Sequence, residues 1–263
     1  MKISISNIAW SEAQDEDMYD FLRKNQVEGI EIAPTRIFPE NPYEKLKDAR
    51  EFGKKIYEQY GLCISSMQSI WYGREERIFE DDNQRKMLIE YTKKAFEFAH
   101  VLNCRNLVFG CPKNRNINCD DDKKVAQEFF QQLGELAEKE ETVLALEANP
   151  PIYNTNFMNT MQEVLEIVRK VNSPGIQINY DLGTTIQNGE DVFEIEKILK
   201  NVNHVHISEP HLAEIKIGEI QKQLVQILKK NKYSKYISIE MKNLGNIEKV
   251  QNVISGIVTL VRS

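Results

Sequence analysis

The chain has 263 residues, 41% of them hydrophobic, and its formal net charge is −6 at pH 7. This length and apolar content allow a large buried core, and no stretch is long and apolar enough to span a bilayer. Lysines are interleaved with acidic residues, so the chain lacks the basic stripe that binds phosphate backbones. We therefore expect neither a nucleic acid nor a membrane as a partner.

The first residues, MKISISNIAW, carry one lysine and a short alternating run, which fits a first strand better than a secretory signal. The cysteines at positions 63, 104, 111 and 119 form no CxxC pair. In a chain without a signal, this spacing argues for reduced thiols. The sequence thus predicts a cytoplasmic protein.

Strand-like runs with a period of two recur along the whole chain. The early ones lie near Ile3, Ile30, Cys63 and Leu107, and the later ones read VLALEANP, IQINYDLGTT, NHVHISEP and YISIEMK. Segments with apolar residues three and four apart lie between them and predict helices. These helical segments are 18–25, 43–60, 85–102, 123–139, 161–171, 193–202, 220–230 and 247–261.

Alternating strands and helices, about thirty residues per unit, require parallel strands joined by right-handed helical crossovers. Eight such units predict an α/β fold with a single (β/α)₈ TIM barrel domain over residues 1–263. An open doubly wound sheet is the competing architecture. The first strand is followed by SNIAWSEAQ instead of the glycine-rich phosphate fingerprint of such sheets, so the barrel is favoured.

Each of the last four strands ends in a side chain that can hold a metal: Glu147, Asp181, His206 and Glu240. Burying three carboxylates within about 5 Å of one another costs roughly 3 kcal/mol per pair at an effective dielectric constant of 20. A bound dication removes that cost. Because the donors are oxygens and one imidazole, we expect one divalent ion, manganese first, with magnesium, cobalt or zinc as alternatives.

Further residues near predicted strand ends are candidates for substrate binding. Glu31 ends the second strand and could bind substrate or an adjacent loop. Trp71 follows the third strand, where it would pack on a sugar face or anchor its loop. Arg115 could hold a substrate oxygen with two hydrogen bonds, and Lys242 could bind an anionic group, or both could be surface charges.

The motifs GIEI, NLVFGCPKNR, LALEANP, INYDLG, HVHISE and ISIEMK, in this order, resemble the xylose isomerase-like TIM barrel superfamily. That group includes sugar phosphate isomerases, ketose 3-epimerases, inositol-pathway enzymes and endonuclease IV. The resemblance covers the whole chain and implies that the four strand-end residues bind one divalent metal. It further implies that Glu147 and Glu240 exchange protons with a sugar, and that Glu209 holds substrate hydroxyls.

Two departures from the resemblance limit what it implies. The ketose 3-epimerases tend to carry a histidine, a glutamate and an arginine where this chain has Thr184, Tyr153 and Leu212, which puts the identity of the sugar in doubt. Endonuclease IV needs extra histidines for three zinc ions, whereas this chain has four histidines, of which His100 lies in a helical segment and His204 is assigned to interior packing.

The sequence therefore predicts an isomerase: a metal-dependent sugar or sugar-phosphate epimerase or isomerase acting through an enediolate. A metal-dependent dehydratase of a keto-polyol and a non-catalytic sugar-binding barrel remain as alternatives. The expected partner is a small-molecule sugar or sugar phosphate. A homodimer is compatible with such a barrel, but no heptad or apolar patch in the sequence decides it.

Overall fold

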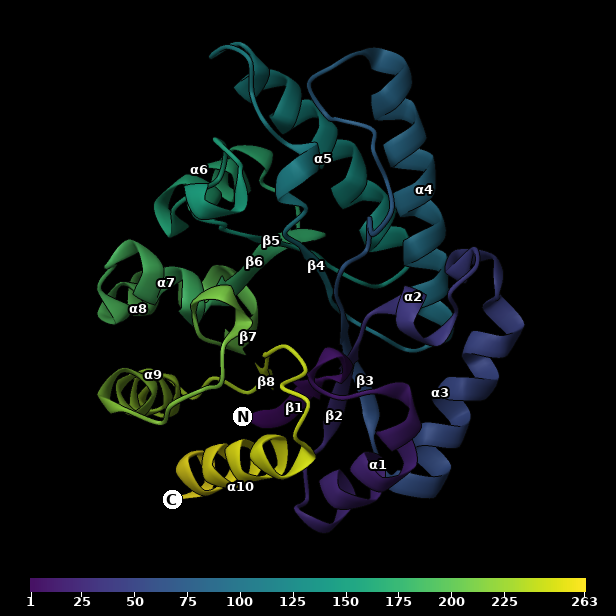
Figure 1. Ribbon diagram of the computed structural model, residues 1–263. Helices are drawn as coiled ribbons and strands as arrows, with labels where there is room; N and C mark the ends of the chain where they lie inside the picture. Colours follow the sequence, from purple (N-terminus) through teal and green to yellow (C-terminus); the bar gives the residue numbers. More distant parts are fainter.

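Eight parallel strands close into a barrel in the computed structural model, which describes residues 1–263 (Figure 1). The strands follow one another around the barrel in chain order, and the last strand pairs with the first. This arrangement confirms the predicted (β/α)₈ barrel. The strands are β1 (Lys2–Ser6), β2 (Gly29–Ile32), β3 (Cys63–Met67), β4 (Leu107–Phe109), β5 (Leu144–Glu147), β6 (Ile176–Asp181), β7 (Val202–Ile207) and β8 (Tyr236–Ile239).

Helices surround the barrel and cover its outer face (Figure 1). The long ones occupy the predicted segments, and shorter ones lie in the loops. They are α1 (Asp15–Lys24), α2 (Pro34–Ile37), α3 (Leu46–Tyr60), α4 (Asp82–Val101), α5 (Asp122–Lys139), α6 (Met161–Val171), α7 (Leu182–Asn188), α8 (Ile195–Ile198), α9 (Glu219–Lys230) and α10 (Ile247–Arg262).

The segment 193–202 differs from its prediction of one continuous helix. It contains α8, flanked by short 3₁₀ helices over Val192–Glu194 and Leu199–Asn201. The buried residues Val192, Ile195 and Ile198 are spaced by three, a spacing that one face of either helix type presents, so the pattern predicts a helix without distinguishing the two. The sequence also gave no sign of α7, which begins directly after Asp181.

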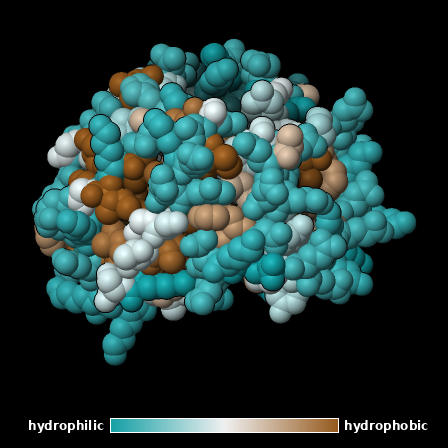
Figure 2. Space-filling view, turned by 60° about the horizontal axis from the view of Figure 1, so that its bottom comes forward, coloured by the Kyte–Doolittle hydropathy of each residue, from teal (hydrophilic) through white to brown (hydrophobic).

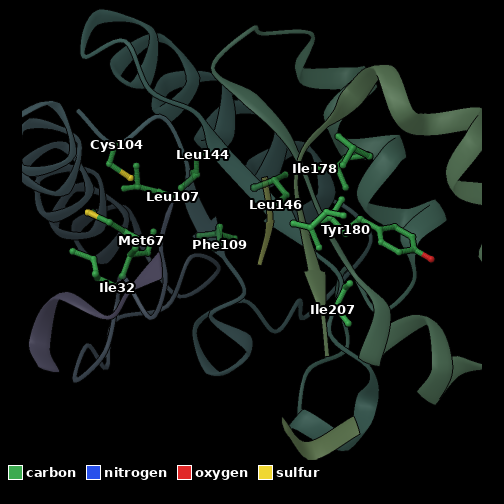
Figure 3. Close-up of a cluster of buried hydrophobic side chains, with 14 of the residues drawn as sticks. Ile32, Met67, Cys104, Leu107, Phe109, Leu144, Leu146, Ile178, Tyr180 and Ile207 are labelled. Atoms are coloured by element: carbon green, nitrogen blue, oxygen red, sulfur yellow. The ribbon is translucent and has the colours of Figure 1, made fainter. Parts of the chain in front are cut away.

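Neighbouring residues of each strand face opposite sides of the barrel wall. Ile32, Leu146 and Ile207 belong to the buried apolar layer between strands and helices, part of which Figure 3 shows. Their chain neighbours Glu31, Glu147 and His206 face the barrel interior, where hydrogen bonds connect them. The hydrophobic core therefore lies outside the barrel, and the interior is left for polar groups.

The barrel interior contains polar side chains that are bonded to one another across strands. Ser4 Oγ on β1 donates to Ser238 Oγ on β8 at 2.8 Å, and Asn106 Nδ2 donates to Ser66 Oγ at 2.9 Å. The buried polar residues also include Ser6, Glu31, Asn179, His204 and His206. Each of these groups needs a partner because an unpaired buried polar group costs about 1–3 kcal/mol.

The outer surface is largely hydrophilic in the view of Figure 2, where hydrophobic residues gather in one area among hydrophilic ones. None of the helices combines the length and the apolar character that crossing a membrane requires.

We predict that Gly175→Ala destabilises the barrel wall. A Cβ at Gly175, just before β6, would lie 2.2 Å from the backbone carbonyl oxygen of Gly134 in α5, and backbone cannot move aside cheaply. The free energy of unfolding in urea should fall by about 3 kcal/mol. Gly218→Ala is the matched control, because its nearest neighbour would be 3.5 Å away. Equal losses in the two variants would contradict the close approach of α5.

Candidate metal centre and active site

The four strand-end residues Glu147, Asp181, His206 and Glu240 converge at one end of the barrel. Glu147 and Asp181 end β5 and β6, His206 is the next-to-last residue of β7, and Glu240 directly follows β8. The carboxyl ends of parallel strands open on the same face. Ligand atoms of Glu147, Asp181 and His206 all lie within 4.8 Å of one another. Glu240 is not a member of that group, but its Oε2 lies 3.2 Å from His206 Nδ1.

The imidazole of His206 is fixed at both of its nitrogens. Nδ1 faces the strand-end acids, 3.3 Å from Glu147 Oε2 and 3.2 Å from Glu240 Oε2. Nε2 lies 2.9 Å from Glu31 Oε2, on the inner side of the ring. A neutral imidazole that donates from Nε2 to Glu31 would present the lone pair of Nδ1 to Glu147, Asp181 and Glu240, which we call the acid cluster. This is the arrangement of a metal ligand.

Burial and like charge perturb the titration of this cluster. Burial, with the nearby charges of Glu147 and Glu240, raises the pKa of Asp181 to about 7. Burial alone would lower the pKa of His206, but Glu240 and Glu31 outweigh it and raise the pKa well above its usual range. In the absence of a metal, the cluster therefore retains protons that a dication would displace.

The donor set fits a hard divalent cation. Carboxylate oxygens and one imidazole nitrogen suit manganese, magnesium or cobalt, whereas structural zinc sites use thiolates. Cys111, on the loop after β4, is the cysteine close enough to Glu147 for the two charges to interact. Burial raises the pKa of its thiol to about 12, so it stays protonated and is not a thiolate ligand.

Three residues that sequence reasoning missed hold the cluster in place. Asn179 Nδ2 donates to Glu147 Oε2 at 2.6 Å, and Asn149 Nδ2 donates to Glu147 Oε1 at 3.0 Å. The hydroxyl of Ser208 donates to Asp181 Oδ2. Each of the three lies two positions from a strand-end candidate in the sequence, Asn179 within β6 and the other two just beyond the ends of β5 and β7. The period of two could therefore have identified them.

Glu31 and Arg115 bond His206 and the backbone of Glu147, and both are too buried for the substrate contact that the sequence predicted for them. Glu31 is fully buried, and besides His206 it accepts a hydrogen bond from Gln68 Nε2 at 3.2 Å. Arg115 is also fully buried and donates to the backbone oxygen of Glu147 and to Asn149 Oδ1, both at 2.9 Å. Because the guanidinium nitrogens of Arg115 donate to protein acceptors, the side chain stabilises the end of β5.

The expectation of a substrate contact is not met by Trp71. Its ring packs edge-on against Phe109 at 4.8 Å between centroids, and its indole nitrogen donates to Thr92 Oγ1 of α4 at 2.8 Å. It therefore belongs to the apolar layer beneath the helices. Glu209 accepts a hydrogen bond from Gln221 of α9 at 2.9 Å, and the side chain of Lys242 is exposed.

Two loops meet near the acid cluster. The hydroxyl of Tyr153, after β5, accepts a hydrogen bond from the backbone nitrogen of His211, after β7, at 3.0 Å. Burial raises the pKa of Tyr153, and the charges of the strand-end acids raise it further. The hydrogen bond thus joins the loop after β5 to the loop after β7.

A sequence model of the xylose isomerase-like TIM barrel family matches residues 19–257. The chain belongs to this family. Family membership agrees with the barrel and with the resemblance drawn from its strand-end motifs.

Individual relatives of this xylose isomerase-like barrel are distant. The uncharacterized protein MJ1311 of Methanocaldococcus jannaschii is 26% identical over 194 residues, which cover 69% of this chain and 66% of that protein, slightly less than two thirds. The crystal structure of 3-keto-D-glucoside 4-epimerase YcjR from E. coli is 17% identical, with a TM-score of 0.80 over 98% of this chain and 99% of that one. The D-psicose 3-epimerase of Clostridium cellulolyticum H10, crystallised with D-tagatose, is 14% identical, with a TM-score of 0.83 over 100% and 98%.

We predict that the metal-free barrel loses stability as pH rises from 6.5 to 8, above the range in which the lowered pKa of His204 has the opposite effect. Asp181 and His206 have raised pKa values in the folded state, so the folded protein holds protons that the unfolded chain releases. Their stabilising contribution is complete below the unfolded pKa and is lost as pH rises to the folded one. In the presence of a chelator, Tm should fall by roughly 5 °C over this range.

Asp181→Asn removes one of these titrations and should reduce that fall in Tm. Saturating Mn²⁺ should offset it in the unsubstituted protein, because metal binding strengthens as the ligands lose protons. If the Tm of the metal-free protein rises over the same pH range, the folded protein does not hold more protons than the unfolded chain, and the prediction is wrong.

We also predict that Glu31→Gln weakens metal binding. Removing the negative charge beside Nε2 lowers the basicity of His206 Nδ1, and losses of about 10- to 100-fold are typical of such changes. Titration calorimetry with Mn²⁺ measures the effect. Glu209→Gln is the matched control, because its carboxylate bonds Gln221 of α9. A Kd for Mn²⁺ that Glu31→Gln leaves unchanged would show that Glu31 does not tune the ligand.

Proposed function

We propose that the protein is a divalent-metal-dependent sugar epimerase or isomerase that works through an enediolate, with Glu147 and Glu240 as acid and base. The observation that carries this proposal is the pair of carboxylates, from non-adjacent strands, that both reach His206 Nδ1 at 3.2–3.3 Å. The fold shared with two sugar epimerases supports it.

The chemistry requires removal of a proton from carbon beside a carbonyl group. One glutamate accepts that proton while the electron pair of the C–H bond moves to the carbonyl oxygen, which gives the enediolate. The other glutamate, protonated, returns a proton to carbon and regenerates the carbonyl with its configuration or position changed. A divalent cation, held by Glu147, Asp181, His206 and Glu240, would supply the positive charge that stabilises the oxygen anion.

The surrounding residues fix the orientation of these acids. Asn149 and Asn179 each donate to one oxygen of Glu147, so its carboxylate cannot rotate freely. Tyr153 and His211, joined by their hydrogen bond, belong to the loops after β5 and β7. We infer that these two side chains contact the sugar, in the role that the sequence assigned to Glu209 and Trp71.

A cavity of about 710 Å³ opens on the same face, at the carboxyl ends of β1, β2 and β3. Tyr72 is among its lining residues and provides an exposed apolar surface for a sugar ring, whereas the ring of Trp10 is buried. Its two arginines are already neutralised, because Arg36 pairs with Asp15 at 2.6 Å and Arg74 pairs with Glu76. The cavity therefore favours an uncharged sugar over a sugar phosphate.

We predict that Glu147→Gln and Glu240→Gln each lower turnover by about 10³-fold or more at saturating Mn²⁺, because glutamine neither accepts nor delivers the proton. Incubation in deuterium oxide with a panel of ketoses and 3-keto-glucosides identifies the substrate, since exchange places deuterium at the reacting carbon. Lys47→Gln, on exposed α3, is the control. Full activity in either glutamine variant would contradict the proposal that both carboxylates transfer protons.

Mass analysis of the product separates the alternatives. Epimerisation and isomerisation conserve the mass of the sugar, whereas a dehydratase acting on a keto-polyol releases water. Binding of a sugar without any deuterium uptake would favour a non-catalytic sugar-binding barrel. This alternative is supported by the residues that replace the histidine, glutamate and arginine typical of ketose 3-epimerases, which are Thr184, Tyr153 and Leu212.

A further inference from the structure

The amino-terminal end of the barrel contains a second cavity, opposite the metal centre. It has a volume of about 540 Å³. Its lining comes from the first residues of β1, β3 and β8, the approach to β4 and the start of β7. The residues that carry the argument are Lys2, Ser65, Arg105, His204, Lys235 and Tyr236.

We propose that this cavity is a binding site for a small phosphate-bearing molecule, separate from the site of the sugar reaction. The proposal does not depend on the proposed reaction, since no residue of the cavity belongs to the acid cluster.

The charge of the cavity lining supports a phosphate ligand. The protein carries 40 acidic and 34 basic residues, yet the cavity lining includes three cationic side chains and no carboxylate. No acid pairs with Lys235: burial lowers its pKa, and its ammonium group bonds only neutral acceptors, which are Gln177 Oε1, the Val202 carbonyl and Asn203 Oδ1, at 2.9–3.3 Å. The ammonium group of Lys2 lies 5.4 Å from the centre of the Tyr236 ring.

Three acids lie near the cavity and offset part of this charge. Glu141 pairs with Arg105 at 3.2 Å. Glu28 accepts a hydrogen bond from the backbone nitrogen of Ile3 at 2.8 Å, and Glu31 lies deeper, 2.9 Å from His206. Lys235 bonds only neutral acceptors and Lys2 lies over the Tyr236 ring, so these two ammonium groups remain to attract a phosphate dianion.

Two buried polar groups at the inner end of the cavity have no hydrogen-bond partner. Ser65 is 4% exposed, lines the cavity, and its Oγ has no hydrogen-bond partner. His204 is 1% exposed, and its Nε2 also lacks a partner, with Glu31 Oε2 at 3.6 Å. Buried polar groups are normally paired, so an unpaired hydroxyl facing a cavity indicates a missing ligand.

The shape of the cavity is maintained by Gly29. A Cβ at this position of β2 would lie 2.9 Å from Tyr236 Cε1 and 3.0 Å from Ser65 Cβ. Glycine therefore allows the Tyr236 ring to lie inside the barrel wall, 6.5 Å from the His204 ring between centroids. Together the two rings form an aromatic wall beside the cationic rim, which would receive the organic part of a phosphate ester.

Titration calorimetry with inorganic phosphate and with ribose 5-phosphate tests the proposal, at constant ionic strength set with sodium chloride. The protein is used both metal-loaded and after chelation, so that phosphate binding at the metal is recognised. We expect saturable binding of one phosphate per chain that survives chelation. We also expect Lys235→Gln and Arg105→Gln to weaken it at least tenfold each.

Two further variants keep the result interpretable. Ser65→Ala removes only a hydroxyl that has no partner, so it should leave Tm unchanged while weakening phosphate binding about threefold to tenfold. Lys47→Gln, whose side chain is 88% exposed on α3, should change neither. Absence of binding at 10 mM phosphate, or equal affinity in Lys235→Gln, Arg105→Gln and Lys47→Gln, would overturn the proposal.

Discussion

The imidazole of His206 lies between carboxylates on both of its sides, and the chemistry of the barrel depends on this contact. Glu31 bonds Nε2 from β2, while Glu147 and Glu240 approach Nδ1 from β5 and β8. The ring thus connects strands from both halves of the chain across the barrel interior. A protonated ring forms ion pairs with these carboxylates, and under the proposed metal binding Nδ1 would be a ligand in the same position.

The fold and the cluster could be predicted because both follow from the period of the strands. Alternation of apolar and polar residues in IQINYDLG and HVHISE separates an outward face from an inward one, and the end of each run fixes where the last inward side chain lies. In a closed parallel barrel all such ends share one face. Asp181 and His206 therefore had to meet, even though no single motif required it.

The positions of Arg115 and Trp71 could not be predicted in the same way, because both lie in loops. The direction of a loop side chain depends on contacts distant in sequence: Arg115 turns toward the backbone of Glu147, and Trp71 toward Thr92 of α4. The break in segment 193–202 was hidden for a related reason. A spacing of three is shared by α-helical and 3₁₀ faces, and the packing of Ile195 and Ile198 decides between them.

The order of the ligands along the chain has a consequence for biosynthesis. Glu240 follows β8, the strand that closes the cylinder by pairing with β1, so the fourth ligand and the final pair of strands emerge from the ribosome together. A nascent chain that ends before β8 has three ligands, an open sheet edge and a polar lumen exposed to water. A chain truncated before that strand therefore can neither close the barrel nor supply Glu240.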